Sequence, residues 1–191
     1  KGSICLLSNT SVNGAVIASP ALEATMFEVE GIKIAHGFYE SGLAINVMYG
    51  LVDGGKRAVE AGIWSIAHDR GMTDELHRQM AIKGVWRAGT ETPISLTGHT
   101  TRERYDQTVA LLRNAWQNKA PLTFSTDADY FVPGKTRGEV AIEFIETWKA
   151  AGIPDADILR AMTINGYTVS ETEQTRGPIK VGMFADLIAV P

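Results

Sequence analysis

Short apolar runs alternate with amphipathic segments along most of this chain, and no other feature of the sequence constrains the fold as strongly. The clearest helix is predicted over residues 102–118, where Tyr105, Val109, Leu112 and Trp116 recur at helical spacing. Alternation of strands and helices with short links is typical of βαβ units and a parallel sheet. The predicted strands are apolar runs rather than alternating ones, which indicates that both faces of the sheet are covered.

The expected elements follow from the same periodicities. An imperfect helix is predicted from about residue 20 to residue 39, with Gly31 weakening it and Gly42 closing it. Strands are expected at residues 4–7, 43–48, 63–67, 85–87, 121–124 and 185–190; helices at 56–61, 73–82, 102–118, 139–150 and 156–162; and loops at 9–19 and 88–101. About five strand–helix units are visible, which predicts either a small open α/β sheet or part of a barrel, since a full (β/α)₈ barrel needs eight.

Composition excludes several classes of partner. The chain has 191 residues and a formal net charge of -4, so no basic surface is available to neutralise nucleic-acid phosphates. No apolar run approaches the ~18 residues that a membrane span requires. The single cysteine excludes an internal disulfide framework and a cysteine-rich zinc site, and leaves the compartment open.

Two of the predicted strands end on side chains that bind metals or move protons. His68 follows the strand at residues 63–67, and Asp127 follows the run Phe124-Ser125-Thr126. In parallel α/β sheets, chemistry is found at the carboxyl ends of the strands. An imidazole and a carboxylate there suit zinc or a similar divalent ion. The alternative interpretations are a structural, hydrogen-bonded histidine and an aspartate that caps the next helix or a turn.

Four segments, in this order along the chain, resemble the metal-dependent amidohydrolases. Residues 60–68 (EAGIWSIAH) are similar to the sixth barrel strand of that family, and residues 125–127 (STD) are similar to the end of its eighth strand. Residues 161–165 (AMTIN) and 177–191 (GPIKVGMFADLIAVP) look like the helix turn and the return segment that lead to the family's small β-domain. The resemblance covers about residues 20–191 and is nearest to the imidazolonepropionase and prolidase-like branch.

The resemblance implies a fold and an activity. Residues 1–176 would form the C-terminal part of a TIM-type (β/α)₈ barrel, about strands 4–8, and residues 177–191 a strand returning toward the small β-domain. The implied enzyme is a metal-dependent hydrolase of a C–N bond in a small amide, cyclic amide or dipeptide. Its cofactor would be a divalent metal, usually zinc, held by His68 and Asp127, and Asp127 would act as general base.

Other residues are weaker candidates for substrate binding. His99 lies in the predicted loop after the seventh strand, Tyr105 lies near the start of the helix that follows it, and Asp129 would orient substrate or accept loop amides. The chain also departs from the family, because no His-x-His pair is present and Met48 stands at the place of the fifth-strand histidine. The missing ligands would come from a longer chain, or the site has decayed.

Two other interpretations therefore stay open. One is a non-catalytic domain of the same ancestry that binds a ligand or a partner subunit, and the chain in either case is a candidate homo-oligomer. The other is an unrelated open α/β enzyme, which is the less favoured because no glycine-rich nucleotide loop follows a strand.

Overall fold

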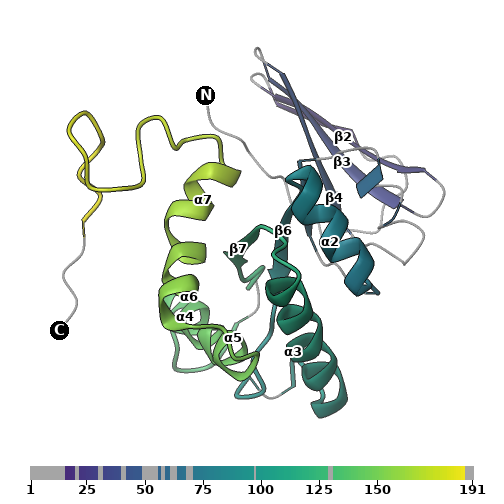
Figure 1. The fold of residues 1–191 in the computed structure, drawn as a ribbon, viewed down its shortest axis with the longest axis vertical. Coiled ribbons are helices and arrows are strands. Elements are labelled where there is room, and N and C mark those ends of the chain that lie inside the picture. The colour runs from purple at the N-terminus through teal and green to yellow at the C-terminus, as the bar shows by residue number, and fades with distance from the viewer. Residues whose placement is uncertain are drawn as a thin grey trace.

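The described part of the chain forms one mixed seven-stranded sheet with helices packed against its parallel part (Figure 1). The structure, a computed structural model, describes residues 16–19, 22–29, 32–39, 42–48, 56, 59–60, 64–67, 71–96, 98–128 and 131–187. Its elements are β1 (Val16–Ser19), β2 (Leu22–Val29), β3 (Ile32–Tyr39), β4 (Gly42–Met48), β5 (Ser65–Ala67), α2 (Asp74–Lys83), β6 (Trp86–Thr90), α3 (Arg102–Gln117), β7 (Leu122–Ser125), α4 (Arg137–Glu143), α5 (Ile145–Ala150), α6 (Asp155–Met162) and α7 (Ile164–Val169).

The helix expected at residues 20–39 is wrong. This stretch forms the antiparallel pair β2 and β3, with Thr25 opposite His36 and Phe27 opposite Ile34. The two strands are separated in sequence only by Glu30 and Gly31, and a short glycine-containing link between β-prone runs is a hairpin signal. Gly31 therefore lies between two strands rather than inside a helix.

The antiparallel arrangement continues on either side of this pair. Gly42 is the first residue of β4 and not a helix cap, and β1 occupies the end of the loop expected at residues 9–19. Strands β1 to β4 pair antiparallel in chain order. The mixed α/β class is thus confirmed, strand–helix alternation is wrong for the described residues between 16 and 48, and the partial barrel stays a prediction. The strand expected at residues 4–7 lies outside the described residues.

The second half of the sheet is parallel, as predicted. β4, β5, β6 and β7 pair parallel in chain order, with Ile66 opposite Arg87 and Gly89 opposite Phe124. The carboxyl ends of these strands consequently lie at the same edge of the sheet. In Figure 1 the antiparallel strands extend away from the helices, whereas β6 and β7 lie among them.

The expected helices are largely confirmed, and their ends follow local signals. Thr73 caps α2 by accepting the Leu76 amide at 3.3 Å, and Gly84 ends it at φ 70°. The helix expected at residues 139–150 is instead two helices, α4 and α5, because the chain turns at the fully buried Phe144. Helix α6 agrees with the expected bounds.

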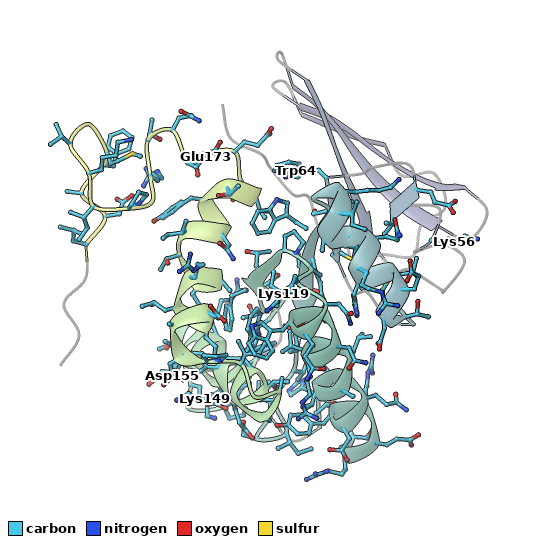
Figure 2. All side chains as sticks on the ribbon, viewed as in Figure 1. Lys56, Trp64, Lys119, Lys149, Asp155 and Glu173 are labelled. Atoms are coloured by element: carbon cyan, nitrogen blue, oxygen red, sulfur yellow. The ribbon has the colours of Figure 1, made fainter. Side chains whose placement is uncertain are left out.

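The main core lies between the parallel strands and the helices. Ile66 of β5, Leu112 of α3 and Trp148 of α5 are essentially inaccessible to solvent and belong to one cluster. Helix α7 closes the opposite, amino ends of the strands. There the Asn165 amide donates to the Leu122 carbonyl at 2.8 Å, and the Trp64 indole donates to the Val169 carbonyl at 2.9 Å (Figure 2).

The return strand expected at residues 185–190 lies partly outside the described residues and stays a prediction. Residues 170–187 form turns and bends, and the Arg176 guanidinium pairs with Asp186 and lies over the Phe184 ring. A strand requires a neighbouring strand for its backbone groups, and none of the described strands is paired with residues 185–187. Residues 188–191 lie outside the described part. Among the described helices, none is long and apolar enough to cross a membrane.

Candidate active site

The candidate site lies where β5, β6 and β7 end. Glu91 follows the last residue of β6, and Asp127 lies two residues beyond β7, at the position expected for it. His68 follows β5 directly in the sequence but lies outside the described residues, as does Asp129. Of the predicted metal ligands, the structure therefore places only Asp127.

Asp127 has an unusual backbone. Its φ of 48° is in the left-handed region, which costs most residues roughly 1–2 kcal/mol and which aspartate tolerates better than bulkier side chains. The preceding Thr126 hydroxyl accepts the Ala128 amide at 3.4 Å. Asp127 is half-buried. Asp127 thus lies just beyond β7, at the sheet edge where active sites of parallel α/β proteins occur.

Asp127 does not cap the next helix. Helix α4 is capped by Thr136, whose hydroxyl accepts the Glu139 amide at 3.2 Å. The Glu139 carboxylate reciprocally accepts the Thr136 amide at 2.7 Å, and these hydrogen bonds hold the pKa of Glu139 below its usual value. The helix-cap interpretation of Asp127 is therefore wrong, while the turn interpretation describes its backbone.

The two described candidates for substrate binding lie on the β6–α3 connection. His99 is exposed, and its amide donates to the Leu96 carbonyl at 3.2 Å. Tyr105, in the first turn of α3, is buried beneath the Arg102 guanidinium, which lies 5.8 Å from the ring centre. Burial raises the pKa of the Tyr105 phenol, and the negative charge of Glu146 raises it further.

A buried ion pair on β6 escaped the sequence analysis. The Arg87 Nη1 atom lies 2.5 Å from Glu91 Oε1, and the two side chains are 2% and 0% exposed. The other carboxylate oxygen accepts the Trp148 indole N–H at 3.3 Å. The signal is an Arg-x-Gly-x-Glu pattern with strand periodicity, and the loop expected from residue 88 is wrong for residues 88–90, which belong to β6.

A second apolar cluster covers this end of the sheet. Leu96 of the β6–α3 connection packs with Val140 and Phe144, and with Phe124 and Ala128 on either side of Asp127. The Glu143 carboxylate accepts the Ser95 hydroxyl at 3.2 Å and pairs with Lys135. Helix α4 thus holds the chain segments that follow β6 and β7.

The described residues do not by themselves make a metal site. No group of three or more His, Cys, Asp or Glu side chains suited to a metal occurs within the described ranges. Zinc in proteins is bound by at least three protein side chains. A zinc site that included Asp127 would therefore need donors from outside the described part, where His68 was the predicted ligand.

Comparisons with known proteins give a limited match. A family model described as a domain of unknown function, DUF8821, matches residues 10–80, which is less than half of the chain. No curated protein matches.

Solved structures match the fold over most of this chain. A Xaa-Pro dipeptidase with bound methionine in the active site has a TM-score of 0.62 and 22% identity, covering 76% of this chain and 38% of that one. An ochratoxinase of A. niger has a TM-score of 0.58 and 20% identity, and the match covers 74% of this chain and 34% of that one. Molinate hydrolase has a TM-score of 0.57 and 16% identity, and the match covers 72% of this chain and 35% of that one.

The similarity is one of fold, because every identity is low. The chain spans little more than a third of the length of these structures. Their names are those of hydrolases, and another match is named an amidohydrolase. The chain therefore shares part of the fold of these proteins.

Proposed function

We propose that this chain is part of a hydrolase that cleaves a C–N bond in a small amide, cyclic amide or dipeptide, with Asp127 as the general base. The observation that carries the proposal is the half-buried carboxylate beyond β7, held in a left-handed backbone conformation at the carboxyl edge of a parallel sheet. The fold similarity to a dipeptidase and to other hydrolases supports the same class of reaction.

Asp127 suits proton transfer. A carboxylate accepts a proton from an attacking water and returns it to the leaving nitrogen, so that the amine departs neutral. The packed residues Phe124 and Ala128 on either side limit the movement of the turn that carries the carboxylate. A restricted base needs little reorganisation to reach the reacting water.

We further propose a divalent metal, most consistent with zinc, held by His68, Asp127 and donors outside the described residues. When bound, such an ion lowers the pKa of its water to about 7 and polarises a carbonyl. His99, Tyr105 and Asp129 remain the candidates for binding the substrate. Because Tyr105 is buried, it would either contact the substrate through its hydroxyl group or act indirectly, by supporting the start of α3.

A second candidate function is a non-catalytic domain that binds a ligand or partner subunit. This candidate is supported by Met48, the last residue of β4. Met48 lies opposite Ala67 of β5, and Ala67 immediately precedes His68 in the sequence. A thioether there replaces the histidine expected from the resemblance and is a poor ligand for zinc. Self-association is part of this candidate function, since a homo-oligomer would supply the partner.

The deciding experiment combines metal analysis with one substitution. Purified protein is analysed for bound metal and assayed on simple amides, cyclic amides and Xaa-Pro dipeptides. Asp127→Asn should lower kcat by about 10²- to 10⁴-fold, as expected for loss of a general base. The matched control is Asp74→Asn, at an exposed position in the first turn of α2. Equal turnover by Asp127→Asn and the parent protein would show that the base is another residue, and absence of both metal and turnover would favour the binding domain.

A further inference from the structure

The buried ion pair on β6 is built around a glycine. Arg87, Gly89 and Glu91 follow one another at every second position, so all three lie on the same face of the strand. A Cβ atom added at Gly89 would lie 1.8 Å from Glu91 Oε1 and 2.4 Å from Arg87 Nη1. The two charged groups therefore meet directly over the Gly89 backbone, and only glycine leaves room for them.

A tryptophan connects this pair to β7. The Trp148 indole N–H donates to Glu91, and the same ring packs on Phe124 with 5.6 Å between ring centres. Phe124 lies three residues before Asp127, and Gly89 is its partner in the strand register. A continuous path of contacts thus runs from the buried Arg87 through the partly buried Phe124 to the turn that carries Asp127.

A gain in folding stability does not explain why the Arg87–Glu91 ion pair is buried. Moving two charges out of water is costly, and replacing a buried ion pair by apolar side chains of similar volume is often neutral or stabilising. Leu112, Ile66 and Trp148 already supply an apolar core beside it. A costly pair in such surroundings is better explained by the single geometry that it imposes on the ends of β6 and β7.

We propose that Arg87, Glu91 and Trp148 are positioning residues, which fix the ends of β6 and β7 so that the Asp127 carboxylate keeps one orientation, without a net gain in stability. The inference rests on the proposed function for the role of Asp127. The cluster itself touches neither substrate nor reacting atoms, and it acts through Phe124 and the strand register.

The test is the double substitution Arg87→Met with Glu91→Leu. It removes both charges and keeps side chains of similar volume. The buried Trp148 indole loses its acceptor, and this loss of stability offsets the gain from removing the two buried charges. The variant should therefore melt within about 5 °C of the parent. The matched control is Glu75→Leu with Arg78→Met, which removes an exposed ion pair of 2.9 Å on α2.

Two readouts separate positioning from stability. Backbone amides of residues 122–128 should exchange with deuterium about tenfold faster in the double variant than in the control variant. On an amide that the parent protein hydrolyses, kcat should fall about 10- to 100-fold with KM changed less than about threefold, because misplacing a catalytic group by about 1 Å has an effect of this size.

The inference is overturned by either of two results. One is a stable double variant with parental hydrogen exchange and parental kcat. The other is a double variant that unfolds or melts far below the parent, since the pair would then be a source of stability. If the parent hydrolyses no substrate, the proposed function fails, and the exchange measurement still decides whether the cluster orders residues 122–128.

Discussion

Gly89→Ala tests the geometry of β6 with a single added methyl group. Its Cβ atom would lie 1.8 Å from Glu91 Oε1, whereas ordinary contact begins at 3.4 Å, so the carboxylate must move by well over an ångström. That movement breaks a 2.5 Å ion pair whose side chains are 2% and 0% exposed. Breaking a buried pair costs about 3–5 kcal/mol.

The effect of alanine on the backbone offsets only a small part of this loss of stability. Gly89 is in a strand without a positive φ, so alanine is compatible with its conformation and gains about 0.4–1 kcal/mol by restricting the unfolded chain. The net loss in the free energy of unfolding is roughly 3 kcal/mol from these two magnitudes. For a domain of this size, that corresponds to a decrease in Tm of about 6–12 °C.

Urea and thermal unfolding measure this loss of stability. A double-mutant cycle tests whether it comes from displacement of the Glu91 carboxylate. Combined with Glu91→Ala, the alanine at position 89 has no carboxylate to displace, so its cost should fall by at least about 2 kcal/mol. Gly138→Ala in α4 is the control, because its nearest contact is the Thr136 hydroxyl at 3.9 Å, and it should be neutral or stabilise by up to ~1 kcal/mol. Gly89→Ala with parental stability would refute the placement of the ion pair.

Two more predictions concern the core and the response to pH. Leu112→Ala should lower the free energy of unfolding by about 2–5 kcal/mol in urea titrations, because its side chain is fully buried, whereas Ile82→Ala, at 76% exposure, should change it by less than ~0.5 kcal/mol. The raised pKa of Tyr105 means that the folded protein holds the phenol proton more tightly than the unfolded chain. Stability from this residue is therefore complete below about pH 10, the unfolded value, and is lost as pH rises through the folded pKa. Unfolding measured from pH 8 to pH 11 should show this decrease in the parent and not in Tyr105→Phe, and identical profiles would contradict the assignment.

The parallel half of the protein was predictable because its signals are local. Thr73 and Gly84 bracket α2, and the periodic apolar positions of α3 predict its bounds within one residue. The apolar run before Asp127 likewise predicts β7 and the position of the carboxylate beyond it. In each case the residues that define the element are those that form it.

The antiparallel half was mispredicted because helix and strand compete there on local signals. Residues 22–29 and 32–39 contain apolar positions compatible with either period, and pairing across Glu30 and Gly31 decides in favour of strands. Such pairing is a contact between two segments, and no single segment encodes it. The candidate site shows the same difference between local and long-range signals. Asp127 is predicted from the strand that precedes it, whereas the hydrogen bond from Trp148 to Glu91 joins distant segments and is not.

The sequence by itself determined the order of the parallel strands and their helices, the caps of α2, and a carboxylate at the end of β7. Local propensity and short-range patterns suffice for these features, since each involves residues close together in the chain. Only the tertiary structure decided that residues 22–39 are strands and that Arg87 and Glu91 are buried together over Gly89. It also decided that Trp148, 57 residues from Glu91, joins that pair to the turn of Asp127, because burial and long-range hydrogen bonds exist only once distant segments have packed.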